Sequence, residues 1–293
     1  MSDDAAPTSV PDESTIPATR AGRRAARRGP DEGGRPEALR AVVTGASSGI
    51  GRAFVEAMAP SGARFVLVAR RRELLEQLAD HLRASGSHAV VHALDLRDVE
   101  AGRAAAEEVL AHHGIPEVLF SNAGHSIARG FRSLVARPDS VTRSVAANFT
   151  GPVCHALPLL GAMCTRGGGH FIATTTVDAR TSVPGWSPNV ASKAGWDAWA
   201  RSVAPELRSD GVATSLLAFP LVATPMLSQA RRARARFAMS PEAAAEWVAR
   251  AVVTRQARVA PWWLRPHELL HAAAPVLTAR VTAPFSMRLV DRG

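Results

Sequence analysis

Short apolar runs alternate with longer amphipathic segments over most of this chain, from about residue 39 to about residue 260. We predict strands at residues 39–45, 64–70, 88–95, 117–124, 169–176, 212–220 and 258–261. We predict helices at residues 49–62, 71–86, 99–114, 140–165, 189–209 and 240–254. Strands that alternate with helices form parallel sheets through right-handed crossovers, and strands covered on both faces are almost wholly apolar. The pattern therefore predicts an α/β fold with a doubly wound parallel sheet, whose ligands bind at the carboxyl ends of the strands.

The two ends of the chain differ in composition from this central part. Residues 1–37 are rich in Pro, Gly, Ser, Asp and Arg and poor in large apolar side chains, so we expect a disordered tail. Residues 38–261 then form a single domain, and residues 262–293 form a C-terminal extension that we expect to be helical. Its apolar side chains would pack on this domain or a second subunit, or lie on a membrane surface as an amphipathic helix.

The composition argues against several classes of protein. We find no apolar run of the ~18 residues that a membrane-spanning helix needs, and no apolar segment of a secretory signal. Cys154 and Cys164 lie too far apart along one predicted helix to pair, and free thiols suit a reducing cytoplasm. The net charge of +9 favours anionic ligands such as nucleotide phosphates, acyl-CoA or an acidic membrane surface. With 5% aromatic residues and no zinc-finger spacing, we expect neither nucleic acid nor metal binding.

The first predicted strand runs directly into a glycine-rich segment, TGASSGIG at residues 44–51. Its spacing, GxxxGxG, differs from the common GxGxxG, but the physical effect is the same. Glycine lets the backbone approach a pyrophosphate closely, and the helix that follows presents free amide groups and the positive end of its dipole. A strand, a glycine loop and a helix in this order predict a dinucleotide-binding site.

Several motifs together resemble the short-chain dehydrogenase/reductase family over about residues 38–260: TGASSGIG, ALDL around Asp95, SNAG at residues 121–124, ANFTG around Asn148, and Lys193. The chain departs from the family at Ser121, where asparagine is usual, and at Leu221, where glycine is usual. The resemblance implies a Rossmann-type site for a nicotinamide cofactor and a homo-oligomer. It assigns cofactor contacts to Gly45, Ser47, Ser48, Gly49, Ile50, Gly51, Asp95, Asn122, Ala123, Gly124, Lys193 and Thr224.

The end of the second predicted strand bears on the choice of cofactor. Enzymes that use NAD(H) tend to have an acidic residue there, which accepts a hydrogen bond from the ribose 2′-hydroxyl. This chain has Ala69 at that position, followed by Arg70. Because a guanidinium pairs well with a phosphate, we predict NADP(H) rather than NAD(H), with Arg70 near the 2′-phosphate.

The catalytic tyrosine of the family is missing. Asn189 stands four residues before Lys193, where the family has that tyrosine, and the chain contains no tyrosine at all. The lysine is retained: Lys193 is the single lysine among 35 lysines and arginines. In the family, lysine holds the ribose, a serine polarises the carbonyl and an asparagine completes a water relay; the resemblance places Thr176 and Asn148 in the last two roles. An amide has no proton to give at neutral pH, and losing a general acid costs roughly 10²–10⁴-fold in rate.

Other groups could deliver the proton. His125, Asp178 and His155 are candidates, as is a water molecule held by Asn148 and Lys193. Asn189 could instead act with Thr176 as an oxyanion donor, which would suit isomerisation or elimination. Three functions therefore stay open: an NADP(H) oxidoreductase with altered proton delivery, an enzyme of non-redox chemistry, and a catalytically silent cofactor-binding protein.

The C-terminal segments FPLVATPM (219–226), SPEAAAEWVARAV (240–252) and RVAPWWLRP (258–266) bear on the substrate. They resemble actinobacterial reductases related to fatty acyl-CoA and fatty aldehyde reductase domains. The resemblance implies a substrate lid at residues 221–239 and a small lipophilic carbonyl substrate, such as a fatty acyl group or an aldehyde.

Overall fold

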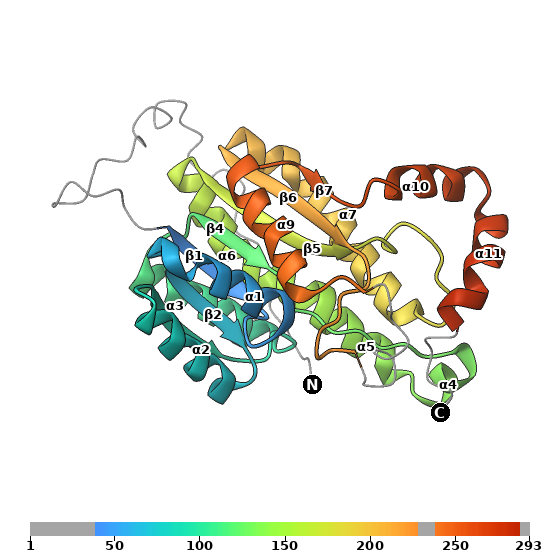
Figure 1. Ribbon diagram of the computed structural model, residues 1–293, viewed down its shortest axis with the longest axis horizontal. Helices are drawn as coiled ribbons and strands as arrows, with labels where there is room; N and C mark the ends of the chain where they lie inside the picture. Colours follow the sequence, from blue (N-terminus) through green and yellow to red (C-terminus); the bar gives the residue numbers. More distant parts are fainter. Residues whose placement is uncertain (1–38, 228–237, 288–293) are drawn as a thin grey trace, which may run out of the picture.

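The computed structural model describes residues 39–227 and 238–287. Seven strands form one parallel sheet in the order β3-β2-β1-β4-β5-β6-β7 (Figure 1). The strands are β1 (Arg40–Thr44), β2 (Arg64–Ala69), β3 (His88–Ala93), β4 (Val118–Ser121), β5 (Gly169–Thr176), β6 (Val212–Phe219) and β7 (Arg258–Val259). The predicted fold class and all seven predicted strands are confirmed.

Helices cover both faces of the sheet and enclose two hydrophobic clusters. One cluster packs α1, α2 and α9 against the sheet, and the other packs α3, α6 and α7 against the opposite face. The helices are α1 (Gly49–Met58), α2 (Arg72–Ala84), α3 (Val99–His113), α4 (Phe131–Ala136), α5 (Asp139–Val145), α6 (Gly151–Arg166), α7 (Ser187–Ser209), α9 (Pro241–Thr254), α10 (Leu264–Ala273) and α11 (Pro275–Met287). The near-continuous apolar strands are explained by this double cover.

The order of the strands reverses between β1 and β4. From β1 the chain adds β2 and β3 on one side, and from β4 it adds β5, β6 and β7 on the other. The loops after β1 and β4 therefore lead to opposite faces of the sheet, and a crevice opens between them at the carboxyl ends of the strands. The glycine-rich segment at residues 44–51 lies at this point.

The predicted long helix at residues 140–165 is present, but its winding is not uniform. The helices α5 and α6 are joined by a π-helical segment, Ala146–Thr150, so that the three run on as one rod. Such π-helical turns inside α-helices are frequent at functional sites. No feature of the sequence pattern predicted this turn.

Gly151, the first residue of α6, allows a very close approach to the loop after β3. A Cβ atom placed there would lie 1.9 Å from the carbonyl oxygen of Leu96 and 2.8 Å from that of Ala146. Both contacts are backbone atoms, which cannot move aside as a side chain can. Glycine at this position therefore brings the rod against the segment that carries Asp95.

Two predicted helix starts can be compared with the structure. The side chain of Ser240 accepts a hydrogen bond from the Ala243 amide at 3.1 Å, which confirms the predicted N-cap of α9. Helix α7 begins at Ser187, two residues before the predicted start. Pro188 explains the difference, since proline suits the first turn of a helix, where the missing amide donor has no intrahelical partner.

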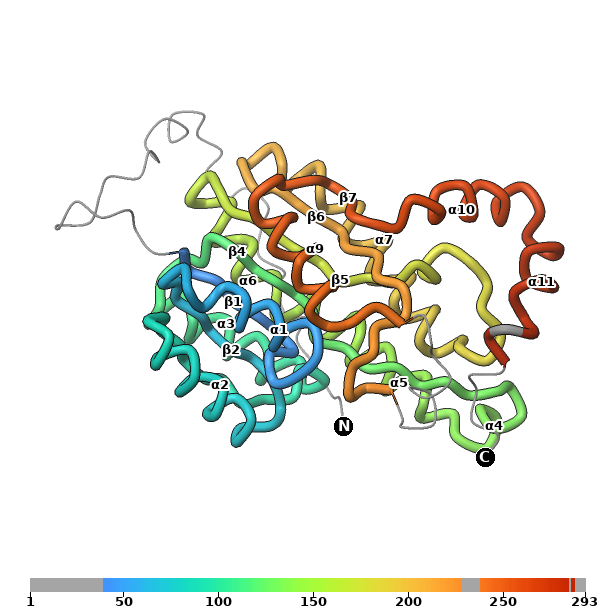
Figure 2. The backbone as a smooth tube through the Cα atoms, viewed as in Figure 1, coloured from blue at the N-terminus to red at the C-terminus, as the bar shows by residue number. Residues whose placement is uncertain are grey.

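The C-terminal extension is helical in its described part (Figure 2). Ion pairs join it to the rest of the domain. Glu268 of α10 pairs with Arg258 of β7 at 2.9 Å and with Arg180, from the loop after β5, at 3.9 Å. Leu264 is fully buried, but other apolar side chains of this segment are exposed, among them Trp262, Leu269, Leu270, Val276, Leu277 and Val281. A second subunit or membrane surface that covers them stays a prediction.

Two of the predicted segments fall wholly or mostly on residues that the structure does not describe. The tail at residues 1–37 and most of the predicted lid, residues 228–237, lie outside the described residues. At the ends of that lid, the Met239 amide donates to the carbonyl of Leu221 at 2.9 Å. None of the helices within residues 39–227 and 238–287 combines the length and the hydropathy that crossing a membrane requires.

Replacing Gly151 with alanine is expected to lower the free energy of unfolding by about 2 kcal/mol or more, because the added methyl group meets backbone on two sides. Gly161, on the same helix, has open space around it, so Gly161→Ala is the matched control and is expected to gain about 0.5–1 kcal/mol from helix propensity. Urea denaturation of both variants measures the difference. Equal stabilities would contradict the close packing at Leu96.

Candidate active site

One cavity of about 730 Å³ occupies the crevice at the carboxyl ends of the strands. Its wall includes most of the residues that the sequence singled out: Gly45, Ser47, Ser48, Gly49, Ile50, Arg70, Asp95, Asn122, Ala123, Gly124, Thr176, Asn189, Lys193 and Thr224. Gly51 and Asn148 do not line it and lie behind its wall. The volume is in the range of small-molecule and cofactor sites.

The glycine-rich loop has the conformation that the sequence predicts. Gly45 and Gly49 have φ values of 70° and 59°, in the left-handed region that disfavours other residues. A Cβ atom at Gly49 would lie 2.8 Å from the Thr224 methyl group, and one at Gly51 would lie 2.6 Å from the Gly45 carbonyl. The loop thus leaves its backbone bare beside the first turn of α1. This arrangement fits the pyrophosphate of a dinucleotide.

The segment after β4 is fixed to the end of β1 by a single hydroxyl group. The Thr44 Oγ1 atom accepts hydrogen bonds from the Asn122 amide at 3.0 Å and from the Ala123 amide at 2.9 Å. The Asn122 side chain in turn donates to the Thr44 carbonyl at 3.2 Å and accepts from Thr174 at 3.3 Å. These hydrogen bonds hold the segment after β4 against β1 on one side and against β5 on the other.

Three arginines gather where β2 and β3 end. Arg71 donates to the hydroxyls of Ser47 and Ser48 at 3.0 and 2.7 Å, across the glycine loop. Arg97 pairs with Asp95 at 2.6 Å, while Arg70 lies 3.9 Å from the same carboxylate. Hydrogen bonds from Arg97 lower the pKa of Asp95 below its ordinary value.

Arg71 and Arg97 are cavity residues that the sequence analysis missed. Arg71 is the second of three consecutive arginines. The sequence alone does not show which of the three faces the glycine-rich loop. Arg97 lies two residues after Asp95. This spacing allows an ion pair between the two side chains only if the chain turns after β3, and the sequence alone did not show that turn. Arg70 itself is largely exposed, with 65% of its side chain accessible.

Lys193 lies deep in the wall of the cavity, on α7. Its ammonium group donates to the Thr174 carbonyl at 3.2 Å, and the Nζ atom is 3.2 Å from where a Gly124 Cβ would be. Burial lowers the pKa of Lys193 to about 8, because the charged form loses its hydration. No carboxylate of the described residues forms an ion pair with it. A half-buried lysine without an ion-pair partner among the described residues suits a site that receives an anion or a ribose.

The side chain of Asn148 connects two segments of the cavity wall through hydrogen bonds. Its side chain accepts from the His125 amide at 2.7 Å, donates to the His125 carbonyl at 2.9 Å, and donates to the Ser192 hydroxyl at 2.9 Å. Ser192 then donates to the Asn189 carbonyl at 2.9 Å. The π-helical turn thus links the loop after β4 to the start of α7. Both the amide nitrogen and the oxygen of Asn148 have partners within the protein. Its predicted place in a water relay stays a prediction.

Asn189, Thr176 and Asp178 all line the cavity, and the last two contact each other. The Thr176 hydroxyl is 3.4 Å from an Asp178 carboxylate oxygen, and the Asp178 amide is 3.3 Å from the same hydroxyl. Burial raises the pKa of Asp178 above its ordinary value, partly offset by the bond to Thr176 and by the charge of His267. The site therefore contains a carboxyl group that is pushed toward its protonated form.

The histidines differ sharply in their access to the cavity. His125 lines it, and burial lowers its pKa, with nearby arginines such as Arg143 acting in the same direction. His155, considered above as a proton donor, is buried on α6 outside the cavity wall, and burial lowers its pKa to about 4. That expectation was wrong, because the side of α6 that bears His155 packs away from the crevice. His267 of α10 also lines the cavity and was missed, since it lies beyond the recognisable motifs.

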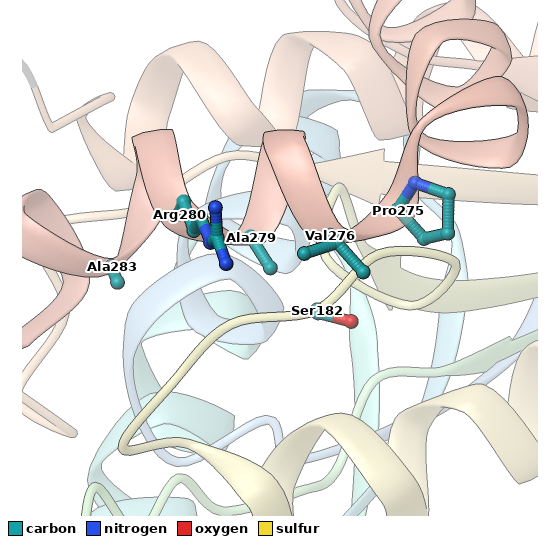
Figure 3. Close-up of a pocket in the computed structure, with 6 residues that line it drawn as sticks. All are labelled: Ser182, Pro275, Val276, Ala279, Arg280 and Ala283. Carbon is teal, nitrogen blue, oxygen red and sulfur yellow. The ribbon is translucent and has the colours of Figure 1, made fainter.

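A second cavity of about 430 Å³ lies between α11 and the loop after β5 (Figure 3). Figure 3 shows Val276 and Ala279 on the side of α11 that faces Ser182. Ser182 lines both cavities, so they meet at this residue. The wall on the side of α11 is mostly apolar, with Arg280 as its one charged residue. Within the described residues, no cluster of three His, Cys, Asp or Glu side chains could hold a metal ion.

Comparisons with known proteins agree with this geometry. A fatty acyl-CoA reductase of Mycobacterium tuberculosis is 37% identical over 223 residues, 76% of this chain and 76% of that protein. A fatty acyl-CoA reductase of Acinetobacter baylyi is 32% identical over 235 residues, 80% of each protein. A metagenomic short-chain oxidoreductase, solved in complex with NADP, is similar with a TM-score of 0.65 and 32% identity, over 76% of this chain and 94% of that chain.

The family profile described as short chain dehydrogenase matches residues 40–235, which include the glycine loop, most of the cavity wall and Lys193. Proteins of this fold bind a nicotinamide cofactor at the crevice described above. With this match and the identities to its relatives, the chain belongs to the short chain dehydrogenase family of oxidoreductases.

Proposed function

We propose that this protein is an NADP(H)-dependent oxidoreductase that reduces a lipophilic carbonyl group, such as that of a fatty acyl thioester or a fatty aldehyde. The observation that carries the proposal is a single continuous cavity. It joins a phosphate-binding loop and an arginine cluster at one end to Lys193 and Thr176 at the other. A scaffold that only bound a partner would not need this combination.

The arginine cluster supports NADP(H) over NAD(H). Arg70, Arg71 and Arg97 present three guanidinium groups where the ribose 2′-phosphate would lie, and Asp95, the one acidic group there among the described residues, is bound by Arg97. A free carboxylate at the end of β2 would favour a 2′-hydroxyl, and Ala69 has none. Guanidinium groups bind phosphates through charge-assisted hydrogen bonds. The similar metagenomic oxidoreductase was solved with NADP.

The residues around Lys193 support hydride chemistry at a carbonyl group. The reduced cofactor supplies the hydride when it is bound. Lys193, desolvated and without a counter-charge, would bind the ribose, and Thr224 would contact the nicotinamide amide. Thr176 offers its hydroxyl to the carbonyl oxygen, while Asn189 adds an amide donor from α7. Asn148 keeps this wall in place from behind.

The walls of both cavities support a lipophilic substrate. Val183, Trp186, Met226 and Leu227 line the main cavity near its catalytic end, and the apolar side of α11 continues beyond Ser182. An acyl chain could follow this path while its carbonyl group lies at Thr176. The two bacterial relatives are both named fatty acyl-CoA reductases.

The proposal is tested by mixing the purified protein with NADPH and fatty aldehydes or acyl-CoA thioesters of several chain lengths. We expect oxidation of NADPH, followed by its absorbance, with alcohol or aldehyde as product. Product formed without NADPH consumption would show non-redox chemistry. NADPH binding without any turnover would show a silent cofactor-binding protein.

Arg71→Ala is expected to weaken NADPH binding about tenfold to about 100-fold, since a hydrogen bond to a charged group contributes about 1.5–3 kcal/mol. Binding of NADH, which has no 2′-phosphate, is expected to change little. Arg72→Ala is the matched control, because Arg72 is exposed, pairs with Glu76 and does not line the cavity. Fluorescence titration with both cofactors measures the effect, and an equal loss for NADH would contradict the assignment.

The affinity for NADPH is expected to fall as the pH rises through about 8, the pKa of Lys193. Burial disfavours its ammonium form, so the group loses its proton at about 8, not near its ordinary value, and above that pH the positive charge that attracts the anionic cofactor is lost. Titrations from about pH 7 to about pH 9 measure this change. Lys193→Met should bind weakly at every pH; if it keeps the same pH dependence, another group is responsible.

Ala279→Phe is expected to fill the second cavity and to lower kcat/KM for long-chain aldehydes about tenfold or more, because each excluded methylene loses about 0.8 kcal/mol. Short-chain aldehydes are expected to react as before. Ala272→Phe, at an exposed position of α10 outside both cavities, is the control. A uniform loss over all chain lengths would argue against an acyl path along α11.

A further inference from the structure

The proposed reduction needs a proton, and the position of the family's tyrosine does not supply one. Asn189 lines the cavity there, and its amide is not an acid at neutral pH. The chain has no tyrosine elsewhere that could move in. The proton must therefore come from another group of the cavity wall or from a water molecule.

Asp178 has both the location and the chemistry of an acid. It is half-buried in the cavity wall and lies within 3.4 Å of the Thr176 hydroxyl, the group nearest to the expected carbonyl oxygen. Its backbone amide also contacts this hydroxyl, so the two side chains are fixed relative to each other. Burial favours the protonated carboxyl, which is the form that can give a proton. Arg180, two residues further on, is engaged by Asp197 and Glu268 and is not free to pair with Asp178.

His267 approaches the same carboxyl group from the C-terminal extension. It lines the cavity, and its charge acts on Asp178. Its Nδ1 atom is shielded from solvent and has no hydrogen-bond partner among the described residues. The neighbouring Glu268 is held by Arg258 and Arg180, which fixes this turn of α10 on the domain. His267 therefore combines a place in the cavity wall with a buried ring nitrogen that has no partner among the described residues, and such a polar atom needs an explanation such as a bound ligand or a proton.

The other titratable groups of the wall fit the role less well. His125 contacts Ser144 at 3.4 Å, and burial together with the charges of Arg143 and Arg70 lowers its pKa, which favours the neutral form over the imidazolium that could act as an acid. Lys193 donates to the Thr174 carbonyl and is reserved for the cofactor in the function proposed above. Asp95 is bound by arginine and favours its ionised form. Asp178 is the remaining acid of the described wall.

We propose that Asp178 supplies the proton through the Thr176 hydroxyl, and that His267 positions this pair and returns a proton to it from solvent. The inference rests on the oxidoreductase function proposed above. As the carbonyl carbon accepts a hydride, its oxygen becomes an alkoxide. The Thr176 O–H bond breaks to protonate this oxygen, and the Asp178 O–H bond breaks to restore Thr176, which leaves an alcohol and a carboxylate. His267 then carries a solvent proton back to Asp178.

The first test compares aldehyde reduction by wild type and Asp178→Asn over a range of pH. In the wild type, kcat is expected to fall as the pH rises through the raised pKa of Asp178, because only the protonated carboxyl can act. Asp178→Asn should lose about 100-fold or more in kcat and should lose this pH dependence, while its NADPH dissociation constant stays within about twofold. Asp80→Asn, at the exposed surface of α2, is the control.

The second test asks for rescue and for the role of His267. Asn189→Tyr in the Asp178→Asn background places a phenol at the family's position and is expected to restore a substantial part of kcat, which a structural role of Asp178 does not predict. His267→Asn removes a charge that lowers the pKa of Asp178, so the fall in kcat should move to higher pH. Carbon-13 NMR of aspartate carboxyl groups should show the same upward move in the free protein.

The outcomes separate the two proposals. If the wild type binds NADPH but reduces no aldehyde or thioester, the proposed function fails. If the wild type is active and Asp178→Asn keeps its rate and pH profile, the proton route is overturned while the function stands. An Asp178 carboxyl whose NMR titration does not respond to His267→Asn overturns the part assigned to His267.

Discussion

The active site depends on the way in which Thr44 joins the two halves of the sheet. This side chain is fully buried at the end of β1, and its hydroxyl accepts two backbone hydrogen bonds from the segment after β4. The strand order reverses at this point, so the loops on either side diverge and leave a crevice. The glycine loop forms one side of the crevice, and Asn122 and Gly124 form the other. Thr176, at the end of β5, and Lys193, on α7, also line the crevice.

Positive charges outnumber negative charges among the described residues that line this crevice. Guanidinium groups gather at one end and a desolvated ammonium lies at the other, while the carboxylate of Asp95 is already paired. A site of this kind is costly to the folded protein alone and is stabilised by an anion. Asp178 is the exception, since its surroundings favour the uncharged carboxyl. Two environments that push titratable groups in opposite directions are typical of catalytic sites.

The fold and much of the site could be predicted from the sequence. Short apolar runs between amphipathic segments located every strand of the described residues, and the glycine loop, Lys193 and Asn189 fell in one cavity as expected. The π-helical turn at Asn148 was not foreseen, because it interrupts the regular period of the helix without a glycine or proline of its own. The close packing of Gly151 on Leu96, directly after it, is a tertiary contact that the sequence pattern does not show. His267 and Arg97 were also missed. Their places depend on how α10 docks and how the turn after β3 folds, and neither leaves a periodic signal.

The most direct test of the proposed function is the transfer of deuterium from NADPH, with deuterium in place of both hydrogens at C4 of the nicotinamide, to a fatty aldehyde or acyl-CoA thioester. Mass spectrometry of the product reads the transfer in a single turnover, so slow catalysis is sufficient. The account predicts one deuterium on the former carbonyl carbon. A product without deuterium, or no product from protein that binds NADPH tightly, would contradict it.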